Sequence, residues 1–153
     1  MLAAGLADAR AGEKRWRMFD QETKLFLAIA DTNELSLVLP EFSCTRAMGF
    51  IDVYGEATDD LRIAMAEFVR TGQPPLIHVQ PDLHHIDPVV DLVFSYDGWH
   101  YKYSLLGNDE SFDRFRREGV LEFKLGNVLV HEEFKVGLDE VGKFIDLCKG
   151  GMP

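Results

Sequence analysis

Hydrophobic and polar residues alternate with a period of two over much of the first third of the chain, a pattern typical of β-strands that bury one face. The runs that fit this pattern are 15–21, 25–33, 34–42 and 49–57. In the third run, Leu35, Leu37 and Leu39 share one face, and Pro40 should bend or end the strand. The first third therefore predicts strands rather than helices.

The period changes after residue 58. Apolar residues now recur at helical spacing and form one stripe, which consists of Leu61, Ala64, Met65, Phe68 and Val69. Asp59 and Asp60 supply the negative charge that favours a helix N-terminus, and Gly72 is a suitable C-terminal stop. We expect an amphipathic helix over 59–72, followed by a short strand within 75–81.

Two hairpins are predicted in the second half. The first spans 89–106, where Asp97-Gly98 separates two β-rich runs, and the second spans 120–136, with Gly126-Asn127 as its turn. The second arm of the first hairpin alternates between two faces. One is apolar and consists of Trp99, Tyr101, Tyr103 and Leu105, and the other faces solvent and consists of His100, Lys102 and Ser104.

Two more helices complete the pattern. A short one covers 108–119, with Asn108 or Asp109 as N-cap and Gly119 as stop. The last covers 137–150 and ends at Gly150; its apolar face consists of Leu138, Val141, Phe144, Ile145 and Cys148. We predict an α+β fold, a mostly antiparallel sheet or sandwich with two or three flanking helices, the last one C-terminal. Residues 12–150 form one globular domain.

Composition narrows the function. The chain has 153 residues, 46% of them hydrophobic and 27% charged, as in globular proteins, and a formal net charge of −10. Such a charge argues against nucleic-acid binding, which needs clustered Lys and Arg, and suits a basic protein partner. No apolar run reaches the length of a transmembrane helix.

The first eleven residues bear on location. They contain Ala7-Asp8-Ala9 and Ala9-Arg10-Ala11, both shaped like signal-peptide cleavage sites, but no basic start and no long apolar core. Residues 1–11 are either the end of an export signal or a flexible N-terminus of a cytoplasmic protein. The first interpretation predicts a periplasmic or secreted protein.

Whether the two cysteines are bonded also depends on whether the protein is exported. Cys44 and Cys148 are too far apart in sequence to form a C-x-x-C motif. In an exported chain they would form one disulfide, and Cys148 faces inward toward the sheet that carries Cys44. In a cytoplasmic chain they would be buried thiols.

The stretch 78–87, HVQPDLHHID, is the one candidate metal site. It carries His78, His84, His85 and Asp87, and His100 or His131 could complete a transition-metal site. Adjacent histidines on an extended chain face opposite sides, and prolines frame the stretch, so the alternative is an ordinary polar loop.

Other chemistry is sparse. The sequence has no phosphate-binding glycine motif, no nucleophile elbow and no H-E-x-x-H, so no catalytic residue is assigned. Trp99, Tyr101 and Tyr103 form a stripe that could be a ligand platform, although aromatic residues at this spacing are more typical of a core.

Three stretches carry a resemblance to a known family. They are LVLPEFSCTRAMGFIDVYG (37–55), with a strand-borne cysteine, GVLEFKLGN (119–127), and FKVGLDEVGKFIDLC (134–148), a closing helix with a terminal cysteine. This layout resembles the invasion-associated locus B family and similar small periplasmic proteins of proteobacteria. The chain departs from that family at 59–70 and 78–87. The resemblance implies a β-rich, exported protein without an established catalytic site.

These observations predict a non-enzymatic binding or structural protein of the bacterial envelope, without a cofactor. One alternative is a metal-binding protein or metal-dependent enzyme that uses 78–87. The other is an acidic cytoplasmic protein that binds a partner, as immunity proteins and chaperones do.

Overall fold

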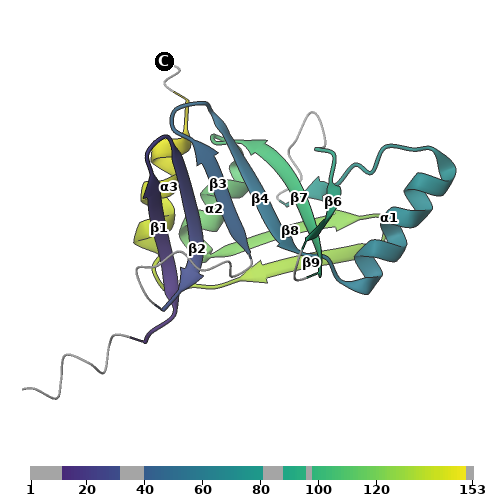
Figure 1. The fold of residues 1–153 in the computed structure, drawn as a ribbon, viewed down its shortest axis with the longest axis horizontal. Coiled ribbons are helices and arrows are strands. Elements are labelled where there is room, and N and C mark those ends of the chain that lie inside the picture. Colours follow the sequence, from purple (N-terminus) through teal and green to yellow (C-terminus); the bar gives the residue numbers. More distant parts are fainter. Residues whose placement is uncertain (1–11, 32–39, 81–87, 96–97, 151–153) are drawn as a thin grey trace, which may run out of the picture.

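A computed structural model describes residues 12–31, 40–80, 88–95 and 98–150 of the chain. Its elements, shown in Figure 1, are β1 (Arg15–Gln21), β2 (Lys24–Ala30), β3 (Glu41–Thr45), β4 (Phe50–Glu56), α1 (Asp59–Thr71), β5 (His78–Val79), β6 (Asp91–Ser95), β7 (Gly98–Leu106), α2 (Glu110–Glu118), β8 (Val120–Leu125), β9 (Val128–Glu133) and α3 (Leu138–Cys148).

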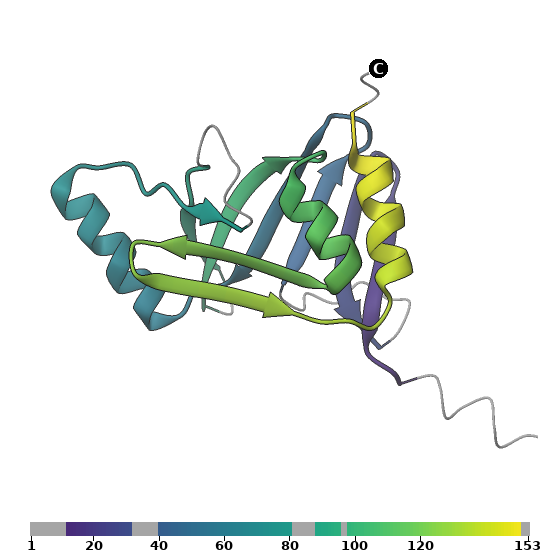
Figure 2. The same cartoon turned by 180° about the vertical axis from the view of Figure 1, so that it is seen from behind.

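The described elements form two layers. One layer is a six-stranded sheet in the order β1-β2-β3-β4-β7-β6, in which every pair is antiparallel. Figure 2 shows that α2, α3 and the β8–β9 hairpin cover one face of this sheet. The hairpin belongs to a second antiparallel sheet, β5-β8-β9. The predicted α+β fold, with a C-terminal helix, is confirmed.

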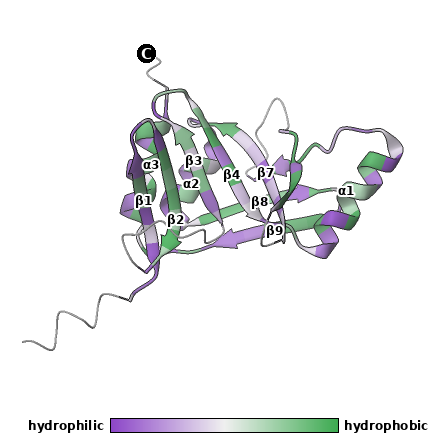
Figure 3. Cartoon of the chain, viewed as in Figure 1, coloured by the Kyte–Doolittle hydropathy of each residue, from purple (hydrophilic) through white to green (hydrophobic). Residues whose placement is uncertain are grey.

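The core lies between the layers because alternate strand residues turn inward. Figure 3 shows hydrophobic and hydrophilic positions mixed along the strands. The largest fully buried side chains of the described residues come from both layers and are Trp16, Leu25, Leu27, Phe42, Ile51, Leu61, Tyr101, Tyr103, Phe112, Phe115, Phe123 and Phe144. Trp16 also donates its indole N–H to the Phe134 carbonyl at 2.9 Å, which joins the sheet to the segment before α3.

The helix ends agree with the sequence except at α3. Thr58 accepts a hydrogen bond from the Leu61 N–H at the start of α1, and Asp109 caps α2. Gly72 and Gly119 end these helices with φ of 70° and 69°, values that glycine adopts without strain. The last helix, predicted to end at Gly150, ends slightly earlier, because its last helical residue is Cys148 and its C-cap is Lys149.

Most of the strand predicted over 34–42 falls on residues 32–39, which lie outside the described part; the described strand β3 begins at Glu41, after Pro40. Two other expectations need correction. Val69 is not buried with the α1 stripe but 72% exposed, because α1 extends past the sheet (Figure 1). His100, predicted to face solvent, is buried, and its Nδ1 lies 2.9 Å from the Ser95 hydroxyl and 3.2 Å from the Tyr54 hydroxyl.

Candidate functional site

The two cysteines are brought together at one end of the molecule. Cys44 in β3 and Cys148 at the end of α3 are at disulfide bonding distance, with their Cα atoms 5.8 Å apart. Both side chains are buried. The bridge joins the C-terminal helix to the centre of the larger sheet, across a sequence separation of 104 residues.

Backbone hydrogen bonds reinforce this junction. The last carbonyls of a helix have no partner within the helix. Here the Ala47 N–H donates to the Leu147 carbonyl at 3.3 Å, and the Gly49 N–H donates to the Cys148 carbonyl at 3.2 Å. The turn between β3 and β4 therefore caps α3, which explains why the helix stops at Cys148 without a glycine cap.

The candidate metal residues fall largely outside the described part of the chain. His84, His85 and Asp87 belong to the stretch 81–87, which the structure does not describe. His78 lies exposed on β5 and pairs through its backbone with Lys124. Within 12–31, 40–80, 88–95 and 98–150, no group of three His, Cys, Asp or Glu side chains is arranged to hold a metal ion.

The stripe of Trp99, Tyr101 and Tyr103 divides into a buried and an exposed part. Tyr101 and Tyr103 are buried and pack edge-on against Phe123 of β8, with ring centroids 4.9 and 5.2 Å away. Trp99 is 39% exposed. Only Trp99 therefore presents a ring to the surface.

Tyr101 links the two sheets. Its hydroxyl donates to Glu132 Oε1 of β9 at 3.3 Å, and its ring lies over Gly55, its register partner in β4. The pKa of the Glu132 carboxyl is raised above its ordinary value of 4.5, mainly because the group is buried. The hydrogen bond from Tyr101 lowers this pKa, and the nearby charge of Glu56 raises it. The Tyr103 hydroxyl is buried, and no described residue is its hydrogen-bond partner.

An apolar groove lies between α1 and the β6–β7 hairpin. It has a volume of about 400 Å³ and is lined by Arg62, Met65, Ala66, Leu92 and Trp99. The Arg62 guanidinium lies 6.0 Å from the centroid of the Trp99 ring. Four of the five lining side chains do not ionise, so the groove suits an apolar guest.

Exposed hydrophobic side chains continue the groove. Phe94 of β6 is 67% exposed, and its ring centroid lies 5.2 Å from that of Trp99. On the other side of α1, Ile63 is also exposed and lines a second apolar cleft against the β8–β9 turn. Apolar surface that gathers in one place commonly marks an interaction site. We call the groove, together with Phe94, the α1–β6 surface.

Charged side chains of α1 and β6 lie around the α1–β6 surface. Arg62 and Arg70 of α1 already pair with Asp59 and Glu67, at 3.1 Å for the first pair. Asp60 of α1 and Asp91 of β6 have no cationic partner among the described residues. Asp60 lines the cleft on the other side of α1, and Asp91 is the register partner of Lys102, so a preference for a cationic partner rests on the net charge of −10.

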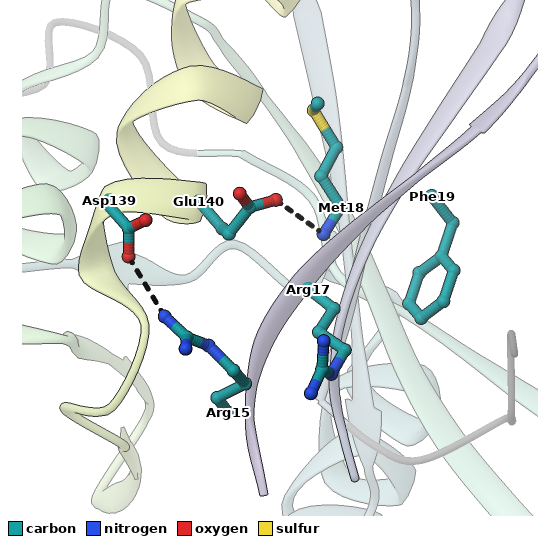
Figure 4. A pocket seen from close by; sticks show the side chains of 6 residues that line it. All are labelled: Arg15, Arg17, Met18, Phe19, Asp139 and Glu140. Atoms are coloured by element: carbon teal, nitrogen blue, oxygen red, sulfur yellow. Dashed lines mark hydrogen bonds and ion pairs between the residues drawn. The ribbon is translucent and has the colours of Figure 1, made fainter. Parts of the chain in front are cut away.

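A second, polar cavity of about 430 Å³ lies at the opposite edge of the sheet (Figure 4). Glu140 of α3 accepts the Met18 backbone N–H at 3.3 Å, and Asp139 pairs with Arg15 at 3.3 Å. The Trp16 N–H donates to the Val136 carbonyl. These contacts use the outer groups of the edge strand β1, so we interpret this cavity as edge protection rather than as a binding site.

The sequence analysis did not identify the α1–β6 surface. The signal that could have found it is the run Leu92, Val93 and Phe94, three consecutive apolar residues that cannot all face one side of a strand.

In the described part of the chain, no helix is long and apolar enough to cross a membrane.

Comparisons with known proteins identify no relative of the chain. A scan against models of protein families, a search of curated proteins and a search of solved structures each find no match to the chain.

Proposed function

We propose that the chain is a non-catalytic binding protein of an oxidising compartment, the bacterial envelope or the exterior, and that it binds a protein partner through the α1–β6 surface. The observation that carries the proposal is the exposure of Phe94 and Trp99 beside an apolar groove. Exposed aromatic residues that can be desolvated by a partner commonly dominate binding energy.

The disulfide supports the location. Disulfides persist in oxidising compartments and are rare in reducing ones. Cys44 and Cys148 lie at bonding distance in a junction that also fixes α3. Intact-mass measurement on protein from its native host should find two hydrogens fewer than the dithiol mass under non-reducing conditions; free thiols would favour the acidic cytoplasmic alternative.

Binding is tested with a pair of matched variants. Phe94→Asp places a charge on the α1–β6 surface, whereas Phe50→Asp places the same charge at a 56% exposed phenylalanine of β4. Oxidised protein is screened against a display library of random peptides. We expect selected peptides to lose affinity at least about tenfold with Phe94→Asp, the loss that follows from removing one hot-spot side chain, and to keep it with Phe50→Asp. Equal effects of the two variants would contradict the proposal.

A further inference from the structure

We propose that the partner is an extended segment that adds as an antiparallel strand to the outer edge of β6, with apolar residues facing the groove and basic residues facing outward. This inference rests on the proposed function, because it specifies how the same surface would be occupied. Strand addition is a common mode of peptide recognition, in which main-chain hydrogen bonds give affinity and alternate side chains give specificity.

The edge of β6 offers backbone groups for such a strand. β6 is the last strand of the larger sheet, and its register with β7 pairs Ser95 with Gly98 next to the hairpin loop. In an antiparallel ladder, hydrogen-bonded pairs alternate with non-bonded ones. The backbone groups of Ser95, Val93 and Asp91 therefore face β7, and those of Leu92 and Phe94 face away from it. No described residue bonds to the outward backbone groups of Leu92 and Phe94.

The same edge already accepts an antiparallel segment a few residues earlier. The Val90 N–H donates to the Pro75 carbonyl at 3.0 Å, and the Ile77 N–H donates to the Pro88 carbonyl at 3.0 Å. Leu76 and Val89 form an isolated bridge between them. An added strand at Leu92 and Phe94 would continue this ladder along β6.

The other sheet edges lack this opening. At β1, the Val136 carbonyl and the Glu140 carboxylate accept the outward N–H groups. Along β9, the exposed side chains are Leu129, His131 and Glu133, and the two ionisable ones discourage pairing with another chain. The exposed side chains of β6 at Val93 and Phe94 are apolar instead. β6 therefore combines outward backbone groups that no described residue bonds with exposed apolar side chains that no charged neighbour on the strand interrupts at Val93 and Phe94.

Side-chain direction and charge define the guest. Leu92 and Phe94 are on the face of the sheet that meets α1, since Leu92 lines the groove with Met65 and Trp99. Residues of the guest that bond to Leu92 and Phe94 would turn their side chains to the same face, into the groove. The intervening residues would lie on the face of the sheet that carries Asp91 and its register partner Lys102, and the net charge of −10 favours lysine or arginine there. A second copy of this chain would bring another Asp91 and another net charge of −10, so a basic segment of a different protein fits better.

The test uses a short synthetic peptide of alternating valine and lysine, titrated into the oxidised full chain. Two N-methylated versions remove backbone donors, one at the valines and one at the lysines. We expect the valine-methylated peptide to bind at least about tenfold more weakly than the parent, since it loses donors to β6, and the lysine-methylated one to bind equally well. Amide exchange of Leu92 and Phe94 should slow in the complex.

The other outcomes overturn the inference. If both methylated peptides bind as the parent does, while Phe94→Asp abolishes binding, the groove binds side chains without strand addition, and only the proposed function stands. If a glutamate peptide binds as tightly as the lysine peptide, the charge argument is wrong. A concentration-dependent dimer that protects the same two amides without peptide assigns the edge to a second copy. If the parent peptide does not bind and no dimer forms, β6 is not a docking edge.

Discussion

Replacing Gly55 by alanine tests whether the tyrosine link between the two sheets is as close as the structure describes. Gly55 is the last residue of the buried row of β4 and lies directly opposite Tyr101 of β7. A Cβ atom built on Gly55 would lie 2.5 Å from the Tyr101 Cε1 atom and still closer to the end of that ring. Real Cβ contacts are almost never this short, so the ring has to move.

The cost follows from two contacts. Overpacking a core position costs about 1–3 kcal/mol, and loss of the hydrogen bond between Tyr101 and Glu132 adds about 1 kcal/mol. We therefore expect Gly55→Ala to lower the free energy of unfolding by about 2–4 kcal/mol. The assay is equilibrium urea denaturation followed by tryptophan fluorescence. Gly142→Ala is the matched control, because Gly142 lies in α3 with its nearest neighbour atoms 3.9 Å from the added methyl; alanine there should stabilise the helix by up to about 1 kcal/mol.

A second variant tests whether the clash with the Tyr101 ring causes the loss of stability. Tyr101→Leu removes the ring end that the new methyl would strike, so Gly55→Ala should cost less than about 1 kcal/mol in that background. If Gly55→Ala costs as much with leucine at this position as with tyrosine, the clash is not the cause. If Gly55→Ala leaves the wild-type stability unchanged, the described approach of the ring to β4 is wrong.

Other perturbations concern the hydroxyls, the disulfide and the buried carboxyl. Tyr103→Phe should raise the free energy of unfolding by about 1 kcal/mol, because it removes a buried hydroxyl without a described partner, and Tyr101→Phe should lower it by about as much; urea denaturation distinguishes the two signs. Reduction of the Cys44–Cys148 bridge should cost up to about 5 kcal/mol, the chain-entropy value for so long a loop, whereas a variant with both cysteines replaced by alanine should not respond to reductant. Because its folded pKa is raised, Glu132 contributes stability that is complete below pH 4.5 and is lost as the pH rises through that raised pKa; Glu132→Gln should remove this part of the pH dependence and stabilise the protein at pH 7. An unchanged pH profile would show that this carboxyl is not desolvated.

Part of the candidate site was predictable and part was not. The sequence placed Trp99 and Tyr101 on one face of a strand and Cys148 on the inner face of the last helix, because both follow from local periodicity. It did not distinguish the exposed Trp99 from the buried Tyr101, since exposure depends on which element lies opposite. His100 shows the same limit. Its place in the alternation predicts a solvent-exposed side chain, yet Tyr54 of β4 lies beside it.

The sequence by itself determined the elements of this protein, the turns between them and the two faces of each strand, because these depend on residues a few positions apart. The tertiary structure alone decided which edges are closed and which apolar residues stay uncovered. α3 closes the edge at β1 through Glu140, and Cys148 of α3 meets Cys44 of β3, both across more than a hundred residues of chain. α1 buries Leu61 and Met65 but leaves Val69 uncovered, and Phe94 and Trp99 remain exposed beside the helix. Local patterns specify what a face is made of, and only the packing of distant segments specifies what covers it.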